Sequence, residues 1–278
     1  MASITDYVVE GLKYPFNDLK KLLSLGVLFA IIGAISTFTS VKSFDIFRAT
    51  AHIIESTNTT ASHLPFSQLP AGDINLVIGL SIVGFIITLF ILGYQYDVVK
   101  FSIEKKADLP GFSDILGLFI KGIKCFITVL AYNIIPIIVL VGGVMLLGNS
   151  SALLFVTLIS VLLFIMAYFL LVMALSNMVA HDSLKKAFDL HEITGNIANL
   201  GWGKYIGIIL FTLIAFMIIT VAANFILGFI TVLFAATISN QAIVISIVIA
   251  IIEGLFVNSY GAIFYNRVCG SIYRESIK

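Results

Sequence analysis

Long apolar runs alternate along the chain with shorter segments rich in charged and polar residues. Apolar stretches occur at residues 22–38, 74–93, 125–147 and 152–179, and a further apolar region covers residues 205–265. An α-helix needs about 20 apolar residues to cross the hydrocarbon core of a bilayer. The pattern therefore predicts four membrane spans, followed by a region with room for more.

The region 205–265 contains no Lys or Arg and a single charged residue, Glu253. Its length suits two spans plus a helix-sized piece at residues 226–239, which either lies at the outer surface or re-enters the membrane. A third full span there would place Arg267, Arg274 and Lys278 outside, against the usual distribution of basic residues. We therefore expect six spans.

Composition excludes a soluble domain. Of the 278 residues, 60% are hydrophobic and 11% charged, and the mean hydropathy is +1.10, more apolar surface than a soluble fold of this size could bury. The fold class expected is an all-α polytopic transmembrane bundle of six helices, embedded in the lipid bilayer. No basic domain suggests nucleic acid, and no pattern suggests a cofactor. Cys125 and Cys269 are interpreted as buried small apolar residues.

The distribution of basic residues predicts the orientation of the spans. The chain has 16 Lys and Arg, and all except Lys42 and Arg48 lie in the N-terminal arm, in the connections 94–124 and 180–204, or in the C-terminal tail. Basic residues accumulate on the cytoplasmic side of membrane proteins. We therefore expect a multi-pass protein of the cell membrane with both termini in the cytoplasm.

Two polar segments flank the first span. Residues 5–14 place apolar residues among Asp6, Glu10 and Lys13, which suits a short amphipathic helix at the membrane interface. On the far side, residues 41–73 are expected to form one long polar connection. It contains Asn58-Thr-Thr, an acceptor sequence for N-glycosylation that is either modified or a chance match. His52 and His63 in this connection lack ligand-spaced partners, so no metal site is expected.

A short motif recurs before the first, third and fifth spans. It reads apolar, polar, acidic, aliphatic, and its acids are Asp18, Asp114 and Glu192. A polar residue and an acid suit a helix start, where side chains cap free amides. We interpret the acids as caps of cytoplasmic helices rather than as a shared acidic site. The chain is then a single domain, 1–278, of three helical-hairpin pseudo-repeats at about 15–108, 109–188 and 189–278.

The sharpest functional candidate is Glu253 in the predicted last span. A carboxylate at mid-membrane costs about 2.5 to 3.5 kcal/mol on insertion scales, so such residues usually face the bundle interior. Asn258 and Tyr260 follow it, Tyr260 on the same helical face, and Asn224 in the fifth span could reach it. Glu253 is either a structural, neutral side chain or a residue that couples ion or proton movement.

Two further patterns lie inside spans. Pro136, with Asn133 three residues earlier, predicts a kink whose freed carbonyl the Asn amide could bond, either as a static bend or as a gating hinge. Gly26, Ala30 and Ala34 recur every four residues and predict a packing seam for another helix rather than a functional groove.

Several short motifs resemble those of an uncharacterised six-span membrane family. They are Tyr14-Pro-Phe-Asn-Asp, Gly93-Tyr, Leu109-Pro-Gly-Phe-Ser-Asp, Trp202-Gly-Lys-Tyr and Ser259-Tyr-Gly-Ala-Ile-Phe-Tyr. The family is catalogued as a domain of unknown function, is common in methanogenic archaea and also occurs in bacteria. It is distantly similar to the membrane domain of some glycerophosphodiester phosphodiesterases. The resemblance implies a fold and a membrane location, and supplies no site residues; this chain has no catalytic barrel.

Two classes of function remain open. The first is a non-catalytic membrane component that organises lipid or a membrane-protein partner, or that self-associates, as the amphipathic cytoplasmic pieces suggest. The second is a transporter or channel for a small solute or ion that uses Glu253. Repeats that all begin from the same side favour the first, because transporters commonly have inverted repeats. We expect no enzymatic activity, since the common catalytic motifs and paired intramembrane acids are missing from the sequence.

Overall fold

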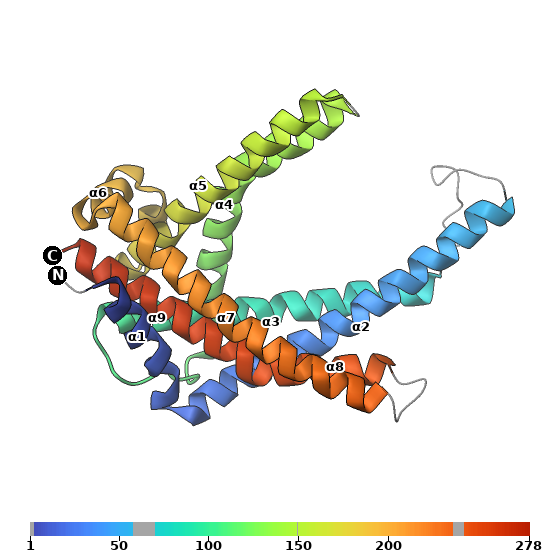
Figure 1. The fold of residues 1–278 in the computed structure, drawn as a ribbon, viewed down its shortest axis with the longest axis horizontal. Coiled ribbons are helices and arrows are strands. Elements are labelled where there is room, and N and C mark those ends of the chain that lie inside the picture. Colours follow the sequence, from blue (N-terminus) through green and yellow to red (C-terminus); the bar gives the residue numbers. More distant parts are fainter. Residues whose placement is uncertain (1–2, 58–69, 149, 236–241) are drawn as a thin grey trace. The chain divides into compact units, whose positions relative to one another are not determined.

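The computed structural model describes residues 3–57, 70–148, 150–235 and 242–278, and the regular elements within these ranges are all helical (Figure 1). Six helical segments are long and apolar enough to cross a membrane, which confirms the predicted class of a multi-pass α-helical membrane protein. The elements are α1 (Ile4–Lys13), η1 (Tyr14–Asn17), α2 (Leu19–Thr57), α3 (Ala71–Ile103), α4 (Ile115–Leu147), α5 (Ala152–His181), η4 (Leu184–Phe188), α6 (Leu190–Leu200), α7 (Trp202–Ala235), α8 (Ala242–Ile252), η5 (Glu253–Asn258) and α9 (Ser259–Ser276).

Helix α2 is much longer than the predicted first span. It continues to Thr57, so the prediction of a loop is wrong for residues 41–57. That segment contains neither Gly nor Pro, and hydroxyls bond back within the helix, as Thr50 does to the carbonyl of Ile46 at 2.8 Å. Nothing in the segment therefore ends the helix. At 39 residues, α2 measures roughly 58 Å along its axis, well beyond the hydrocarbon thickness.

Helix α7 corrects a second prediction. Residues 226–235 continue α7 without interruption and do not form a separate surface or re-entrant piece. Gly228 is the one weak helix former in that segment, and a single Gly costs only about 1 kcal/mol. Residues 236–239 of the predicted piece lie outside the described residues.

The polar connection between α3 and α4 is shorter than the pattern suggested. It covers residues 104–114, because α3 extends to Ile103 and α4 begins at Ile115. Asp97, Lys121 and Lys124 therefore belong to helices, although their charges predicted a loop. Their pairing, described below, explains how these helices accommodate charged side chains.

The chain divides into two compact units. The first, called unit 1, comprises Met1–Leu22, Leu89–Met217 and Gly261–Lys278; unit 2 comprises Leu23–Thr88 and Ile218–Tyr260. The three predicted pseudo-repeats stay a prediction.

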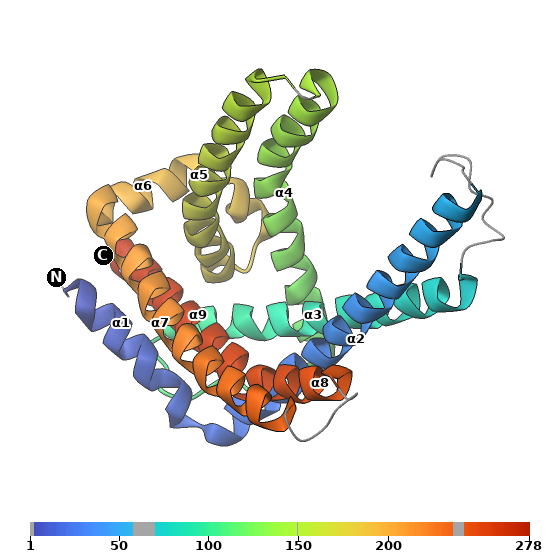
Figure 2. The same ribbon diagram turned by 45° about the vertical axis from the view of Figure 1, so that its right-hand side comes forward.

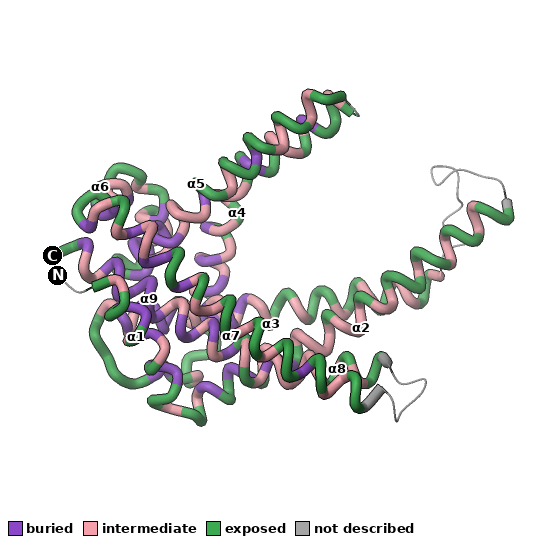
Figure 3. Tube along the Cα trace, viewed as in Figure 1, coloured by how far each residue is buried: buried purple, intermediate pink, exposed green. Residues whose placement is uncertain are grey.

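Unit 1 contains most of the buried residues (Figure 3). Its largest fully buried side chains include Tyr94, Tyr205, Phe264 and Tyr273. Within this unit α4 and α5 lie side by side as a hairpin, which both ribbon views show (Figures 1 and 2). Large apolar side chains along the hairpin are exposed, as lipid-facing positions are expected to be.

Close backbone approach joins α3 to α4 in unit 1. A Cβ on Gly93 would overlap the backbone of Leu118, and a Cβ on Gly122 would overlap the backbone of Leu89. Next to Gly93, the ring of Tyr94 stacks on Phe112, with 4.5 Å between centroids. Two of the family-like motifs therefore pack directly against each other.

Unit 2 has a comparable seam. A Cβ on Gly26 of α2 would clash with the carbonyl of Leu255, and a Cβ on Gly254 would clash with the backbone at Ala30. The packing seam predicted from Gly26 and Ala30 is confirmed. Small residues on both sides let the two backbones come this close.

Two of the three predicted helix caps are confirmed. Asp18 accepts a hydrogen bond from the amide of Lys21 at 3.1 Å, and Asp114 accepts one from Gly117 at 2.9 Å. The third prediction is wrong: α6 is capped by Asp189, which accepts from the amide of Glu192 at 3.2 Å. Glu192 occupies the first turn instead, where its charge also meets the helix dipole favourably.

Candidate functional site

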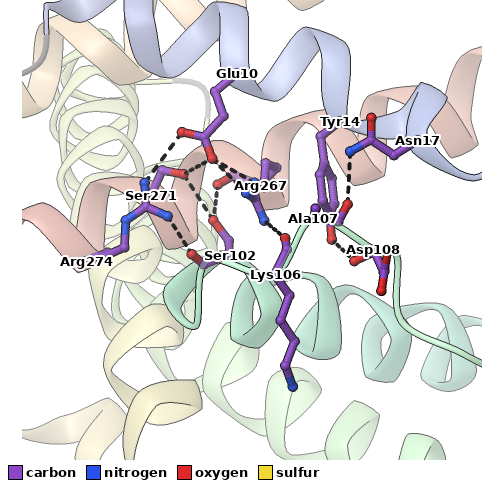
Figure 4. Close-up of polar contacts among 10 residues, drawn as sticks. All are labelled: Glu10, Tyr14, Asn17, Ser102, Lys106, Ala107, Asp108, Arg267, Ser271 and Arg274. Atoms are coloured by element: carbon purple, nitrogen blue, oxygen red, sulfur yellow. Dashed lines mark hydrogen bonds and ion pairs between the residues drawn. The ribbon is translucent and has the colours of Figure 1, made fainter.

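Helix α1 is joined to α9 by a partly buried ionic network, which we call the arginine clamp: Glu10, Ser102, Arg267, Ser271 and Arg274 (Figure 4). Glu10 of α1 accepts from Arg267 at 2.8 and 3.0 Å and from Arg274 at 3.4 Å. The side chain of Arg267 is only 7% exposed. A guanidinium so buried needs its charge compensated, and Glu10 supplies the compensation.

The same arginines hold the end of α3. Arg267 donates to the carbonyl of Lys106, and Arg274 donates to the carbonyl of Ser102, each at 2.8 Å. The hydroxyl of Ser102 donates in turn to the carbonyl of Arg267 at 2.6 Å and lies 3.1 Å from the Ser271 hydroxyl. One guanidinium group thus bonds a carbonyl in the last turn of α3, and the other bonds a carbonyl in the connection that follows it.

Two further side chains tie the start of the chain to the α3–α4 connection (Figure 4). Tyr14 donates to the carbonyl of Asp108 at 2.5 Å, and Asn17 donates to that of Ala107 at 2.9 Å. The Arg267 guanidinium lies over the Tyr14 ring, 4.1 Å from its centroid. Burial raises the pKa of Tyr14 to about 12, so the phenol stays a hydrogen-bond donor at neutral pH.

A second charged pair joins α3 to α4. Lys121 donates to both carboxylate oxygens of Asp97, at 2.8 and 2.9 Å. Residues 97 and 121 were expected to lie in the connection 94–124, and the structure places both in helices instead. The pair lies near the ends of α3 and α4, one turn or two from the connection.

The end of α5 carries a third charged contact. Asp182 accepts from the Tyr96 hydroxyl at 2.7 Å and from Lys124 at 2.9 Å. The hydrogen bond from Tyr96 lowers the pKa of the Asp182 carboxyl most, and the hydrogen bond from Lys124 lowers it further. Asp182 itself has a left-handed backbone, with φ of 47°, a conformation that Asp tolerates better than most residues.

A fourth group lies between η4 and α6. Lys186 is bonded to Asp189 at 3.2 Å and to Glu192 at 2.5 Å. The hydrogen bond that Lys186 donates to Glu192, and then the one it donates to Asp189, raise the pKa of Lys186. His181 lies 3.6 Å from Glu192. Within the described ranges no group of three or more His, Cys, Asp or Glu could hold a metal ion.

A cavity of about 420 Å³ lies between α4, α5 and the η4–α6 segment of unit 1; we call it the hairpin pocket. Pro136, the predicted kink residue, lines it, and so do Tyr132 and Ala167. Helix α4 runs continuously through Pro136. Asn133 donates to the carbonyl of Val129 at 2.8 Å, four residues back in its own helix. Whether the segment is a hinge stays a prediction.

The predicted polar group around Glu253 lies in unit 2. Glu253 is half-buried and begins η5, a π-helical segment that ends at Asn258. Asn258 is exposed, and the exposed Asn224 donates to the carbonyl of Thr220 at 2.9 Å in its own helix. A π-helical turn alters which residues share a face, so the α-helical spacing that placed Tyr260 beside Glu253 does not describe this segment. The grouping stays a prediction. The predicted glycosylation residue, Asn58, lies outside the described residues.

Sequence reasoning missed the arginine clamp. Glu10 and Arg267 are 257 positions apart, and neither belongs to a motif that predicts pairing. The available signals were weak: an acid in an amphipathic N-terminal helix, and arginines spaced seven apart in a segment rich in small and apolar residues. Residues seven apart share a helical face, so Arg267 and Arg274 were candidates for a common acidic partner.

Comparison with known proteins places the chain among proteins of unknown function. It is 27% identical to an uncharacterised protein of Methanocaldococcus jannaschii, over an alignment that covers 99% of this chain and 98% of the relative. No solved structure gives a significant match. The model of the family described as "Protein of unknown function (DUF4013)" matches residues 76–228, more than half of the chain. The chain therefore belongs to the DUF4013 family.

Proposed function

We propose that this protein is a non-catalytic, multi-pass component of the cell membrane that organises lipid or a partner complex, with both termini in the cytoplasm. The arginine clamp carries the proposal. Its charged groups bond one another and backbone carbonyls, and so fasten α1, α3 and α9 together. Charges committed to architecture in this way serve a rigid platform better than they serve a reaction.

The proposed orientation draws support from contacts within unit 1. The segments predicted to be cytoplasmic touch one another: Tyr14 reaches the α3–α4 connection at Asp108, and Asn199 of α6 donates to the carbonyl of Ser276 at 3.3 Å. Basic residues are concentrated in these same segments. Common location on one side, with an excess of Lys and Arg, is the usual signature of the cytoplasmic face.

The absence of enzymatic activity belongs to the same proposal. So does the distant similarity to the membrane domain of glycerophosphodiester phosphodiesterases. The family matched has no assigned function, so the site geometry is the basis for the proposal.

Extraction from the native host in mild detergent, with particle sizing and mass spectrometry, tests the organising role. We expect a partner protein, or a second copy of the chain, to remain at stoichiometric ratio after washing. An unrelated six-span protein purified in parallel serves as the control for adventitious carry-over. A lone particle that moves a solute across proteoliposomes would contradict the proposal.

One observation favours the alternative, a transporter or channel. The π-helical segment at Glu253–Asn258 interrupts the regular bonding of a membrane helix next to its intramembrane carboxylate, and such segments are frequent at functional sites. The test is flux through proteoliposomes containing Glu253→Gln. The matched control is Glu55→Gln, which changes an exposed acid in α2 of the same unit. Flux lost only with Glu253→Gln, in a protein that remains folded, would establish the transport role.

A further inference from the structure

The hairpin pocket opens at the surface of two membrane helices. Its lining is apolar, with Pro136 and Ala167 at its wall, and Ile135 and Met166 on its rim are 63% and 56% exposed. The lining also includes Tyr132, but its hydroxyl already donates to the carbonyl of Ala187 at 2.7 Å. The pocket therefore offers hydrocarbon surface to whatever occupies it, and hydrocarbon chains surround helices of this kind.

A recess whose lining includes charged side chains adjoins the hairpin pocket. It is lined by Ser183, Lys185, Lys186, Phe188 and Asp189. Phe188 is common to both cavities, and its ring stacks on Tyr132 with 6.2 Å between centroids. An apolar cavity and a recess with charged side chains in its lining thus meet at a single aromatic side chain.

The recess has one cation more than its own acids neutralise. Lys186 is engaged by Asp189 and Glu192. Lys185 is exposed and, within the described part of the chain, forms no ion pair. Ser183 precedes η4 and its hydroxyl does not cap that segment. One ammonium group and one hydroxyl are therefore available to an anion beside an apolar cavity.

We propose that unit 1 binds one anionic phospholipid, with a hydrocarbon chain in the hairpin pocket and its phosphate at Lys185 and Ser183. An amphiphile with a negative head matches both cavities at once, whereas a soluble anion would leave the apolar cavity unfilled and a neutral lipid would leave Lys185 unpaired. The site goes beyond the proposed organising role and does not depend on it, since a transporter could equally hold a structural lipid.

Native mass spectrometry of the delipidated full-length protein, titrated with phosphatidylglycerol or phosphatidylcholine, tests the head-group contact. Lys185→Gln removes one basic residue near the membrane surface. It should therefore weaken phosphatidylglycerol binding about fivefold. Binding of phosphatidylcholine should not change. The control is Lys13→Gln, an exposed lysine of α1 that lines neither cavity and should leave both affinities unaltered.

A second pair of variants tests the hydrocarbon contact. Ala131→Phe fills the hairpin pocket from α4 and should weaken binding of both lipids. Ile134→Phe, at an exposed position that does not line the pocket, is its control. Leu163→Phe fills the pocket from α5 and replaces Ala131→Phe if that variant does not fold.

The outcomes separate a lipid from other ligands. Equal phosphatidylglycerol affinity in Lys185→Gln and Lys13→Gln would overturn the proposal. So would pocket-filling variants that retain full lipid affinity while inorganic phosphate displaces the lipid, because the site would then recognise free phosphate. Measured on purified protein, these results are independent of any partner or flux, so failure here leaves the proposed function standing.

Discussion

At the scale of single residues, the contacts made at position 267 of the arginine clamp require the guanidinium group of an arginine. Its guanidinium bonds Glu10 and the Lys106 carbonyl through separate nitrogens and lies over the ring of Tyr14. Lysine has one nitrogen and cannot satisfy these groups together. We expect Arg267→Lys to lower the free energy of unfolding by about 2 kcal/mol, measured by denaturant titration in detergent.

Arg48→Lys provides the control for this prediction. Arg48 belongs to α2 and lies over the Phe44 ring, 4.8 Å from its centroid. An exposed cation–π contact contributes only about 0.5 to 1 kcal/mol, and lysine keeps part of it. If both substitutions destabilise the protein equally, the clamp is not a principal source of its stability.

Asp182 provides a prediction about pH. Its pKa is lower in the folded protein than its usual value of 3.8, because Tyr96 and Lys124 donate to it. A carboxyl whose pKa is lowered by folding stabilises the fold at pH values above its pKa in the unfolded chain. This contribution disappears as the pH falls through its pKa in the folded protein. The side chain is 67% exposed, so we expect only about 0.5 kcal/mol.

Asp182→Asn removes that charge and still tolerates the left-handed backbone. The variant should be slightly less stable than the parent at pH 7, and the difference should disappear as the pH falls through the folded-state pKa of the parent carboxyl, which then becomes protonated. Thermal unfolding measured across this range checks the expectation. A stability difference that does not change with pH would show that the charge of Asp182 is not responsible.

At the scale of elements, local signals predicted the structure well and long-range ones did not. Alternating apolar runs indicated six spans, and the acids before α2 and α4 indicated their caps, because both features depend on neighbouring residues. Helix ends were misjudged where polarity was taken for a loop: residues 41–57 are polar yet contain no helix breaker. The clamp and the π-helical segment depend on packing between distant parts of the chain, which one sequence does not reveal.

The glycines where α3 crosses α4 give a prediction at this scale. A methyl group at Gly122 would overlap the carbonyl of Leu89, so Gly122→Ala must push two helices apart. We expect a loss of about 1 to 3 kcal/mol, as for other overpacked sites. At Gly79, in α3, a Cβ meets nothing within 4 Å, and Gly79→Ala should stabilise the helix by up to about 1 kcal/mol. If SDS-unfolding measurements show that Gly122→Ala lowers the stability and Gly79→Ala raises it, the prediction is confirmed. Equal effects of the two substitutions would contradict the close approach of α3 and α4 at Gly122.

At the scale of the whole molecule, residues from four of the family-like motifs lie in the same compact unit. Tyr14, Gly93, Phe112 and Tyr205 come from motifs far apart in sequence, and all lie in unit 1. There they are engaged in contacts, such as the 2.5 Å hydrogen bond from Tyr205 to the carbonyl of Phe169. We infer that these four residues serve the architecture of unit 1 rather than a reaction.

The proposed orientation gives the last prediction. Green fluorescent protein fused after Lys278 should fluoresce in a bacterial host, and alkaline phosphatase inserted at Ser150, in the α4–α5 turn, should be active, since each reporter works on one side of the membrane only. Phosphatase inserted at Lys105, in the α3–α4 connection, is the matched control and should be inactive. The reverse pattern would refute cytoplasmic termini. It would also move Lys185 to the outer surface, so the same reporters decide from which leaflet the proposed phospholipid is drawn.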